Sequence, residues 1–279
     1  MAKAAKATRT SERGRVGAED RGGRVQSLTR ALALLNLLAQ HEDGMTLTDA
    51  ARAAGLAPST AHRLLTTLQH ERFVRFDGEN ARWLVGLQAF SVGSAFLHTR
   101  DLGRSARPVL RRLVDETGET ANLGVEDDGM AVYLGQVQSR QLMRAIVKPG
   151  GRVFMHGSGV GKALLAALPP AEAVRIVRQR GLPVFTPRTI TDEARLLRHL
   201  EEVRARGFAV DDEEYAVGLR CVAAAVFDED GAAMGAVSVS GPAVRVTRER
   251  VGELGEAVRR GADGLTLDLG GRRAPPRPR

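Results

Sequence analysis

The sequence has very little cysteine and few aromatic residues, and it lacks long apolar runs. One Cys in 279 residues cannot form a disulfide framework within the chain, which fits a reducing compartment. With one Trp and two Tyr, the core must consist largely of Leu, Val and Ala. No apolar run reaches the length of about 18 residues that a membrane span needs, and the best, residues 31–39, is interrupted by Asn36. We therefore expect a cytoplasmic globular protein without a signal peptide.

The net charge of +8 is concentrated at the two ends of the chain. Residues 1–24 contain seven Lys or Arg and three Asp or Glu, giving +4, and residues 272–279 contain four Arg and no acid, giving another +4. The residues between them therefore sum to zero. We expect these tails to be disordered and either to raise non-specific DNA affinity or to aid solubility. A prediction of DNA binding must rest on a motif instead.

The region from residue 25 to residue 86 has the element order of a winged helix-turn-helix. The pattern predicts a helix from residue 28 that ends around residues 41–44 and helices over 47–54 and 58–70, followed by extended runs over residues 73–76 and 82–86. Thr46 can cap the second helix, Gly55 can end it, and Pro58 suits the first position of the third. This order favours DNA binding over the alternative of an ordinary solvated helix face.

The faces of the third helix separate a core from a possible DNA contact. Apolar residues at helical spacing from Ala61 to Leu68 form the buried stripe. The opposite face and the wing offer hydroxyl and guanidinium donors for phosphates and base edges. These DNA-binding candidates are Ser59, Thr60, Arg63, Thr66, Thr67, Arg72, Arg75 and Arg82. Because this region contains six basic and six acidic residues, we expect affinity to come from the placement of charge or from dimer avidity.

The rest of the chain mixes strands and helices. Residues 87–118 are expected to form linker helices, and residues 119–271 a second domain. In that domain strands are predicted at 121–126, 130–137, 142–147, 207–210, 221–227 and 233–240, and helices at 160–168, 171–179, 192–206 and 246–269. This mixture, with a hairpin-like pair near the end, predicts an α+β fold on a largely antiparallel sheet.

One cluster in the second domain suits a small carboxylate. Residues 158–161 open a helix, whose free amides and dipole favour an anion. Ser238 and Ser240 alternate in a strand and so face one side, where they and Cys221 can donate hydrogen bonds. Asp211 would repel a carboxylate if ionised, so we expect it to be protonated or to accept from a hydroxyl or hydrate group.

Other chemistry is less consistent with these residues. A phosphate-binding P-loop would need Gly in place of His156 and Ser or Thr in place of Ala163. Cys221 with His156 and Asp211 could form a nucleophilic triad, but a lone Cys in an apolar strand is more often a packed residue. The acidic run 211–214 cannot converge on one metal ion, because consecutive side chains diverge. We predict no metal, cofactor or catalytic residue.

Six segments of the chain resemble the isocitrate lyase regulator (IclR) family: residues 25–31, 59–65, 83–86, 156–162, 211–214 and 218–221. They follow in the family's order and spacing over about residues 25–270. The resemblance implies a winged-helix domain followed by a GAF- or profilin-like effector domain, without enzymatic activity. It also implies a homodimer or homotetramer that binds a near-palindromic operator in double-stranded DNA.

The resemblance further implies a repressor of a small-carboxylate operon of the glyoxylate-bypass or acetate type. The effector would be a 2-oxo acid such as glyoxylate or pyruvate. An activator, or a repressor of a ureide or aromatic-acid operon, is the alternative, and a hydrolase using Cys221 is a distant one. By position, the effector would contact amides of Gly159 and Val160, polar groups of Asp211, Cys221, Ser238 and Ser240, and an apolar wall of Leu142, Ala145, Val153 and Leu219.

Overall fold

The computed structural model describes residues 25–99, 102–145 and 147–272. The first basic tail, and the second beyond Arg272, therefore lie outside the described residues. The chain divides into two compact units at residues 95 and 96. Among the helices of the described ranges, none combines the length and hydropathy needed to span a lipid bilayer.

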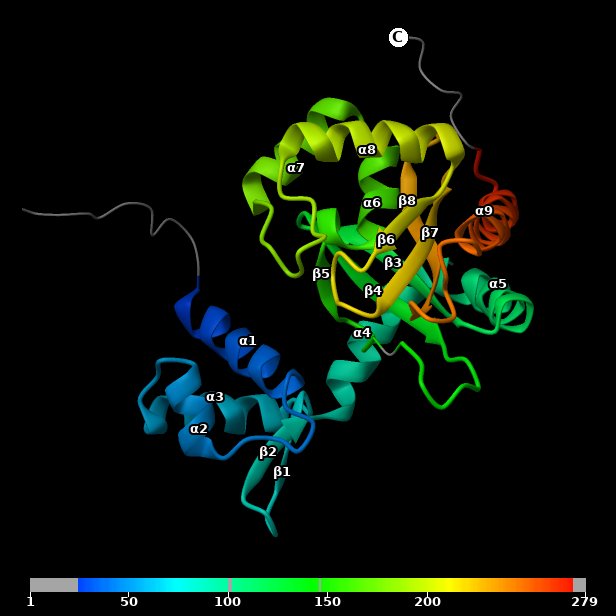
Figure 1. Ribbon diagram of the computed structural model, residues 1–279. Helices are drawn as coiled ribbons and strands as arrows, with labels where there is room; N and C mark the ends of the chain where they lie inside the picture. The colour runs from blue at the N-terminus through cyan, green and yellow to red at the C-terminus, as the bar shows by residue number, and fades with distance from the viewer. Residues whose placement is uncertain (1–24, 100–101, 146, 273–279) are drawn as a thin grey trace, which may run out of the picture. The chain divides into compact units, whose positions relative to one another are not determined.

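The N-terminal unit is a small helical domain with a two-stranded wing (Figure 1). Its elements are α1 (Gln26–Ala39), α2 (Leu47–Ala53), α3 (Pro58–His70), β1 (Val74–Asp77), β2 (Arg82–Val85) and the start of α4 (Leu87–Thr99). The Thr46 hydroxyl caps α2 by accepting the Asp49 N–H at 3.2 Å. Gly55 has a φ of +63°, which favours glycine, and Pro58 starts α3 as predicted.

The core of this unit holds the three helices against the wing. Leu34 and Leu38 of α1 pack with Ala61 and Leu65 of α3, and Trp83 of β2 closes the cluster. The two strands are antiparallel and joined by a turn at residues 78–81. The predicted stripe of apolar residues along the third helix is therefore the buried side of α3.

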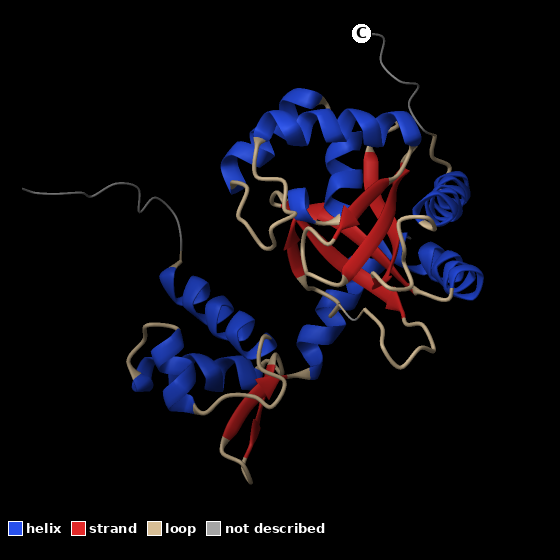
Figure 2. Cartoon of the chain, in the orientation of Figure 1, coloured by secondary structure: helices blue, strands red, loops and turns tan. Residues whose placement is uncertain are grey.

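The second unit is built on a six-stranded antiparallel sheet of order β5-β4-β3-β8-β7-β6 (Figure 2). The strands are β3 (Thr120–Asp127), β4 (Met130–Val137), β5 (Arg152–Phe154), β6 (Ala209–Asp212), β7 (Leu219–Phe227) and β8 (Ala233–Pro242). The helices are α5 (Leu102–Thr117), α6 (Gly159–Ala167), α7 (Pro170–Arg180), α8 (Glu193–Arg206) and α9 (Val251–Asp268), with a 3₁₀ turn, η1 (Met155–Gly157). The α+β fold on an antiparallel sheet is as predicted.

Helices cover both faces of this sheet, which is therefore buried on both sides. Helices α5 and α9 lie against one face, and α6, with α7 and α8 beyond it, against the other (Figure 1). Strand alternation explains the sorting of side chains. In β8, Val237 and Val239 pack toward α5 and α9, whereas Ser238 and Ser240 point to the face under α6. The polar residues of the sheet thus gather on one buried face.

Two segments differ from the sequence expectation. Helix α5, expected within a linker over residues 87–118, contributes Leu102, Val109 and Leu113 to the core between α5, α9 and the sheet. The strand predicted at 142–147 is wrong for the described residues of that range, which form a loop. On this side of the sheet β4 pairs with β5 through Met130, Ala131 and Val132, and the described residues of 142–147 pair with no strand.

Candidate DNA-binding face and ligand site

Helix α3 presents a polar face to solvent opposite its buried stripe. Ser59, Arg63 and Thr66 are exposed, and Thr60 is half-buried. The Thr67 hydroxyl, also on the exposed side, donates to the Arg63 carbonyl oxygen at 2.9 Å. Thr67 is therefore already engaged with the helix backbone, whereas Arg63 extends a guanidinium without an ion-pair partner among the described residues.

The three arginines of the wing are placed differently. Arg75 in β1 is exposed. Arg72 follows the end of α3 with a φ of +61°, and its backbone N–H donates a hydrogen bond to the Gln69 carbonyl oxygen at 2.9 Å. Arg82 in β2 is half-buried and donates to the Gly44 carbonyl oxygen at 3.0 Å. Arg82 thus fastens the loop before α2, whereas the side chains of Arg72 and Arg75 are exposed and form no ion pair among the described residues.

The predicted effector residues meet under the N-terminus of α6. Strand register places Cys221 opposite both Asp211 and Ser240, and Ser238 lies two pairs further along β8, on the same face. Gly159 approaches so closely that a Cβ there would lie 2.9 Å from the Cys221 sulfur. The Gly159 N–H donates to that sulfur, and so does the Ser238 hydroxyl. The structure therefore brings together the amides of α6 and all of the predicted polar residues.

The predicted apolar wall is only partly assembled. Val153 is buried in β5 and belongs to the same core cluster as Val160. Leu219, at the start of β7, and Ala145 are half-buried. Leu142 is 100% exposed in the loop between β4 and β5, so the structure does not bring it to this cluster.

The carboxyl of Asp211 has a pKa well above the ordinary value for an aspartate. Burial raises its pKa to about 7, an effect that the nearby Lys162 ammonium and two backbone N–H bonds reduce. Those donors are the amides of Glu214 and Tyr215, at 2.7 and 3.3 Å from Oδ1. Burial therefore favours the neutral carboxylic acid, which repels a nearby anion less than an ionised carboxylate does.

Known proteins match both units of the chain. A family model described as "IclR helix-turn-helix domain" matches residues 27–78, and one described as "Bacterial transcriptional regulator IclR C-terminal" matches residues 94–266. The chain belongs to the IclR family. It is a DNA-binding transcriptional regulator and not an enzyme.

Individual relatives resemble the chain over nearly their whole length. It is 45% identical over 253 residues to the transcriptional repressor IclR of Escherichia coli, covering 90% of this chain and 92% of that protein. It is 46% identical, with the same coverage, to the acetate operon repressor of Salmonella typhimurium. The solved structure of Thermotoga maritima IclR matches with a TM-score of 0.74 at 28% identity, covering 88% of this chain and 100% of that one.

The surroundings of Cys221 in this IclR-family regulator do not activate a thiol. Burial raises the pKa of Cys221 to about 12, and the nearby Asp211 carboxyl raises it further. His156, the third member of the hypothetical triad, instead directs Nε2 at the Pro183 carbonyl oxygen, 3.1 Å away. Cys221 is therefore a neutral S–H donor at the ligand site.

The Gly-rich stretch before α6 has a steric role. A Cβ on Gly161 would lie 2.2 Å from the Met155 Cα, so glycine is required for α6 to pack on η1. The Ser158 hydroxyl oxygen caps the helix by accepting the Gly161 N–H at 3.0 Å. These contacts account for the spacing that resembles a phosphate-binding loop.

Two parts of the site were missed by sequence reasoning. Lys162, which is 0% exposed, pairs with the buried carboxylate of Glu214 beside Asp211. Asn122 donates to the Ser240 hydroxyl oxygen at 3.0 Å and accepts from Gln136 at 2.9 Å. The signal for Lys162 was a charge inside an otherwise apolar helix, which must be paired when buried. Asn122 and Gln136 required the strand register.

Proposed function

We propose that this regulator represses a small-carboxylate catabolic operon of the glyoxylate-bypass or acetate type. Two relatives that share about nine-tenths of the chain are a "Transcriptional repressor IclR" and an "Acetate operon repressor". In this proposal the protein binds a near-palindromic operator as a homodimer or homotetramer, because one recognition helix reads few base pairs. It acts in the cytoplasm, where that DNA is located.

The effector in this proposal is a small 2-oxo acid such as glyoxylate or pyruvate, bound at the cluster under α6. The observation that supports it is that Cys221 lies opposite Asp211 in the sheet and in contact with Gly159, the first residue of α6. The helix N-terminus suits the ligand carboxylate. Because Asn122 donates to the Ser240 oxygen, the hydroxyl proton of Ser240 is free to donate to the oxo oxygen.

Calorimetric titration of glyoxylate and pyruvate into the full chain tests this assignment. Removing one hydrogen-bond donor to a charged ligand typically costs about 1.5–3 kcal/mol, or one to two decades in affinity. We expect that loss for Ser240→Ala and for Cys221→Ala, whereas Cys221→Ser, which keeps a donor, should lose much less. Operator affinity without effector should stay near that of the original protein.

Three results would contradict the proposal. Wild-type affinity for 2-oxo acids in both alanine variants would place the effector site elsewhere. Binding of ureides or aromatic acids in place of glyoxylate and pyruvate would favour another operon. In a reporter assay, the protein without effector should lower transcription of the target genes. If it does not, and transcription rises when the effector binds, the protein is an activator.

A further inference from the structure

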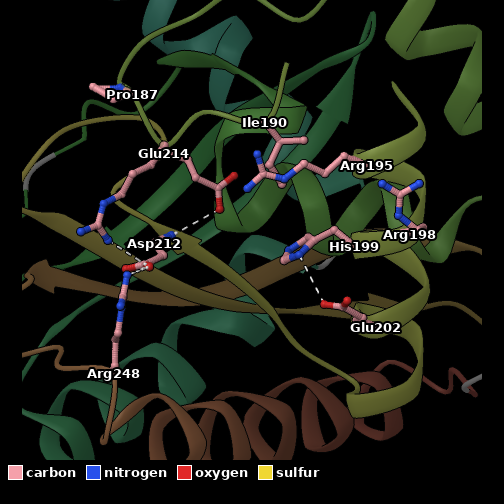
Figure 3. A pocket seen from close by; sticks show the side chains of 10 residues that line it. Pro187, Ile190, Arg195, Arg198, His199, Glu202, Asp212, Glu214 and Arg248 are labelled. Carbon is pink, nitrogen blue, oxygen red and sulfur yellow. Dashed lines mark hydrogen bonds and ion pairs between the residues drawn. The ribbon is translucent and has the colours of Figure 1, made fainter. Parts of the chain in front are cut away.

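A second hollow in the effector domain lies outside the cluster under α6. It has a volume of about 530 Å³ and opens between α8 and the segment that joins β6 to β7 (Figure 3). We call it the arginine pocket, after a lining that includes Arg188, Arg195, Arg198, His199, Glu214 and Arg248. A volume of this size suits a small metabolite.

Positive charge in the arginine pocket exceeds the carboxylates that could neutralise it. Arg188 and Arg248 both bind Oδ2 of Asp212, at 3.1 and 2.7 Å, and Arg220 binds Oδ1 of the same carboxylate at 2.7 Å. Three guanidinium groups therefore converge on Asp212, with Glu213 as a second partner for two of them. Three guanidinium groups against these two carboxylates leave a net positive charge on this side of the pocket.

Arg195 and Arg198 add two further guanidinium groups from one side of α8. Three residues apart, they are neighbours on the helix surface. Neither forms an ion pair with any residue that the structure describes. Figure 3 shows Arg195 reaching from α8 toward the carboxylate of Glu214. Guanidinium groups without a carboxylate partner suit a phosphate, which they can bind bidentately.

The same pocket also holds two buried acceptors without partners. Nε2 of His199 and Oε2 of Glu214 are both buried, and neither has a hydrogen-bond partner among the described residues. Burial lowers the pKa of His199 to about 4, with Lys162, Arg206 and Arg195 adding to the effect, so the ring is neutral at pH 7. Its Nδ1 faces the Glu202 carboxylate at 3.6 Å, which favours a proton there and leaves Nε2 as an acceptor.

A bare anion would satisfy only half of this lining. Phosphate suits Arg195 and Arg198, but it offers Glu214 Oε2 and His199 Nε2 no stable donor. Hydroxyl groups provide such donors, and a buried acceptor left without one is unfavourable. We propose that the arginine pocket binds a phosphorylated polyol, with its phosphate on Arg195 and Arg198 and its hydroxyls on His199 and Glu214.

Calorimetric titration of the full chain with glycerol phosphate, a pentose phosphate and a hexose phosphate tests the proposal. At least one of them should bind ten or more times tighter than inorganic phosphate and than its own unphosphorylated polyol. Arg195→Gln should weaken that binding at least tenfold, and His199→Leu should remove most of the preference over inorganic phosphate. Arg175→Gln, an exposed arginine on α7 outside the pocket, is the matched control and should change nothing.

Several outcomes would overturn the proposal. These are no binding by any of the three phosphates, equal binding of inorganic phosphate, equal binding of a hydroxy acid such as citrate, or unchanged affinity in Arg195→Gln. A thermal unfolding curve for each variant shows whether a loss reflects misfolding. Cys221→Ala should leave polyol phosphate binding intact while weakening 2-oxo acid binding, so failure of one site is distinguishable from failure of the other.

Discussion

The two units of this regulator place their functional side chains in opposite environments. In the N-terminal unit, Arg63 and Arg75 are exposed on a domain whose core is formed by other residues. In the second unit, Asp211, Cys221 and Ser238 are buried between the sheet and α6 and share hydrogen bonds with the backbone. Function and stability are therefore separable in the first unit and coupled in the second.

This difference makes the buried ion pair the most sensitive point of the molecule. Lys162→Ala would leave the Glu214 carboxylate unpaired in the interior, which typically costs about 3–5 kcal/mol. We expect urea unfolding to show that loss in the second unit. Arg152→Ala, which removes an exposed pair with Asp127, should cost about 0–1 kcal/mol.

The paired substitution Lys162→Met with Glu214→Leu removes both charges and should recover much of the stability lost by Lys162→Ala. Equal losses in the free energy of unfolding for Lys162→Ala and Arg152→Ala would show that burial of the Lys162–Glu214 pair does not make it more important for stability than an exposed pair.

In the exposed unit, the expected effect is on DNA alone. Arg63→Ala should cost about 1–3 kcal/mol on the operator and relax preference at one base pair, while the unfolding transition stays unchanged. Operator and scrambled DNA titrations measure this. Arg75→Ala should weaken both DNAs alike, and Arg82→Ala should lower the stability of the unit, because Arg82 holds the Gly44 carbonyl. Equal losses on both DNAs for Arg63→Ala would reassign it to a phosphate contact.

The buried unit should also respond to pH. If the effector carboxylate needs a neutral Asp211, its affinity should fall about tenfold per pH unit above pH 7. Because the pKa of Asp211 is about 7 in the folded protein and 3.8 in an unfolded chain, the stability of the fold should fall as pH rises from 3.8 to about 7, where only the unfolded chain is ionised. Calorimetry between pH 6 and 9 should show the slope in the original protein and a flat profile in Asp211→Asn. A slope that survives in Asp211→Asn would belong to another group.

The smallest expected effect concerns specificity after removal of the tails. Deleting residues 1–22 and 273–279 removes +3 from each end, six of the eight excess charges. Non-specific DNA affinity should fall and its salt dependence should flatten, because fewer counterions are released. The ratio of operator to scrambled DNA affinity should stay nearly constant. A collapse of that ratio would show that a tail reads bases.

Local patterns in the sequence predicted most of the fold. The cap at Thr46, Pro58 at the start of α3 and the stripe around Leu65 each depend on neighbours within one turn. The strand expected at 142–147 was wrong because apolar composition does not show whether a segment finds a strand partner, and the described residues of that range pair with none. Helix α5 could not be assigned to the second core from its own periodicity, which shows a buried face but not its partner.

The ligand site was predictable as far as single positions carry a signal. Ser238, Ser240 and Cys221 were placed on one face by alternation, and the register confirms that they are neighbours. Asn122 and Gln136 precede Ser240 by more than one hundred residues in the sequence. Only the pairing of the strands shows that Asn122 contacts Ser240 and that Gln136 contacts Asn122. The arginine pocket likewise needed α8 and the segment after β6 to be brought together.

A series of side-chain hydrogen bonds crosses the sheet with every donor on the same side of its acceptor. Gln136 donates to Asn122, Asn122 donates to Ser238, and Ser238 donates to the sulfur of Cys221. Each group accepts a hydrogen bond from the group before it, so the direction of donation is set by the first donor, the half-buried side-chain amide of Gln136. A change there from an amide to a carboxylate, which cannot donate when ionised, would reverse the order of donors. In the proposed site, a substitution at Gln136 would therefore change the hydrogen bonds that Asn122 offers to Ser238 and Ser240 without altering either serine.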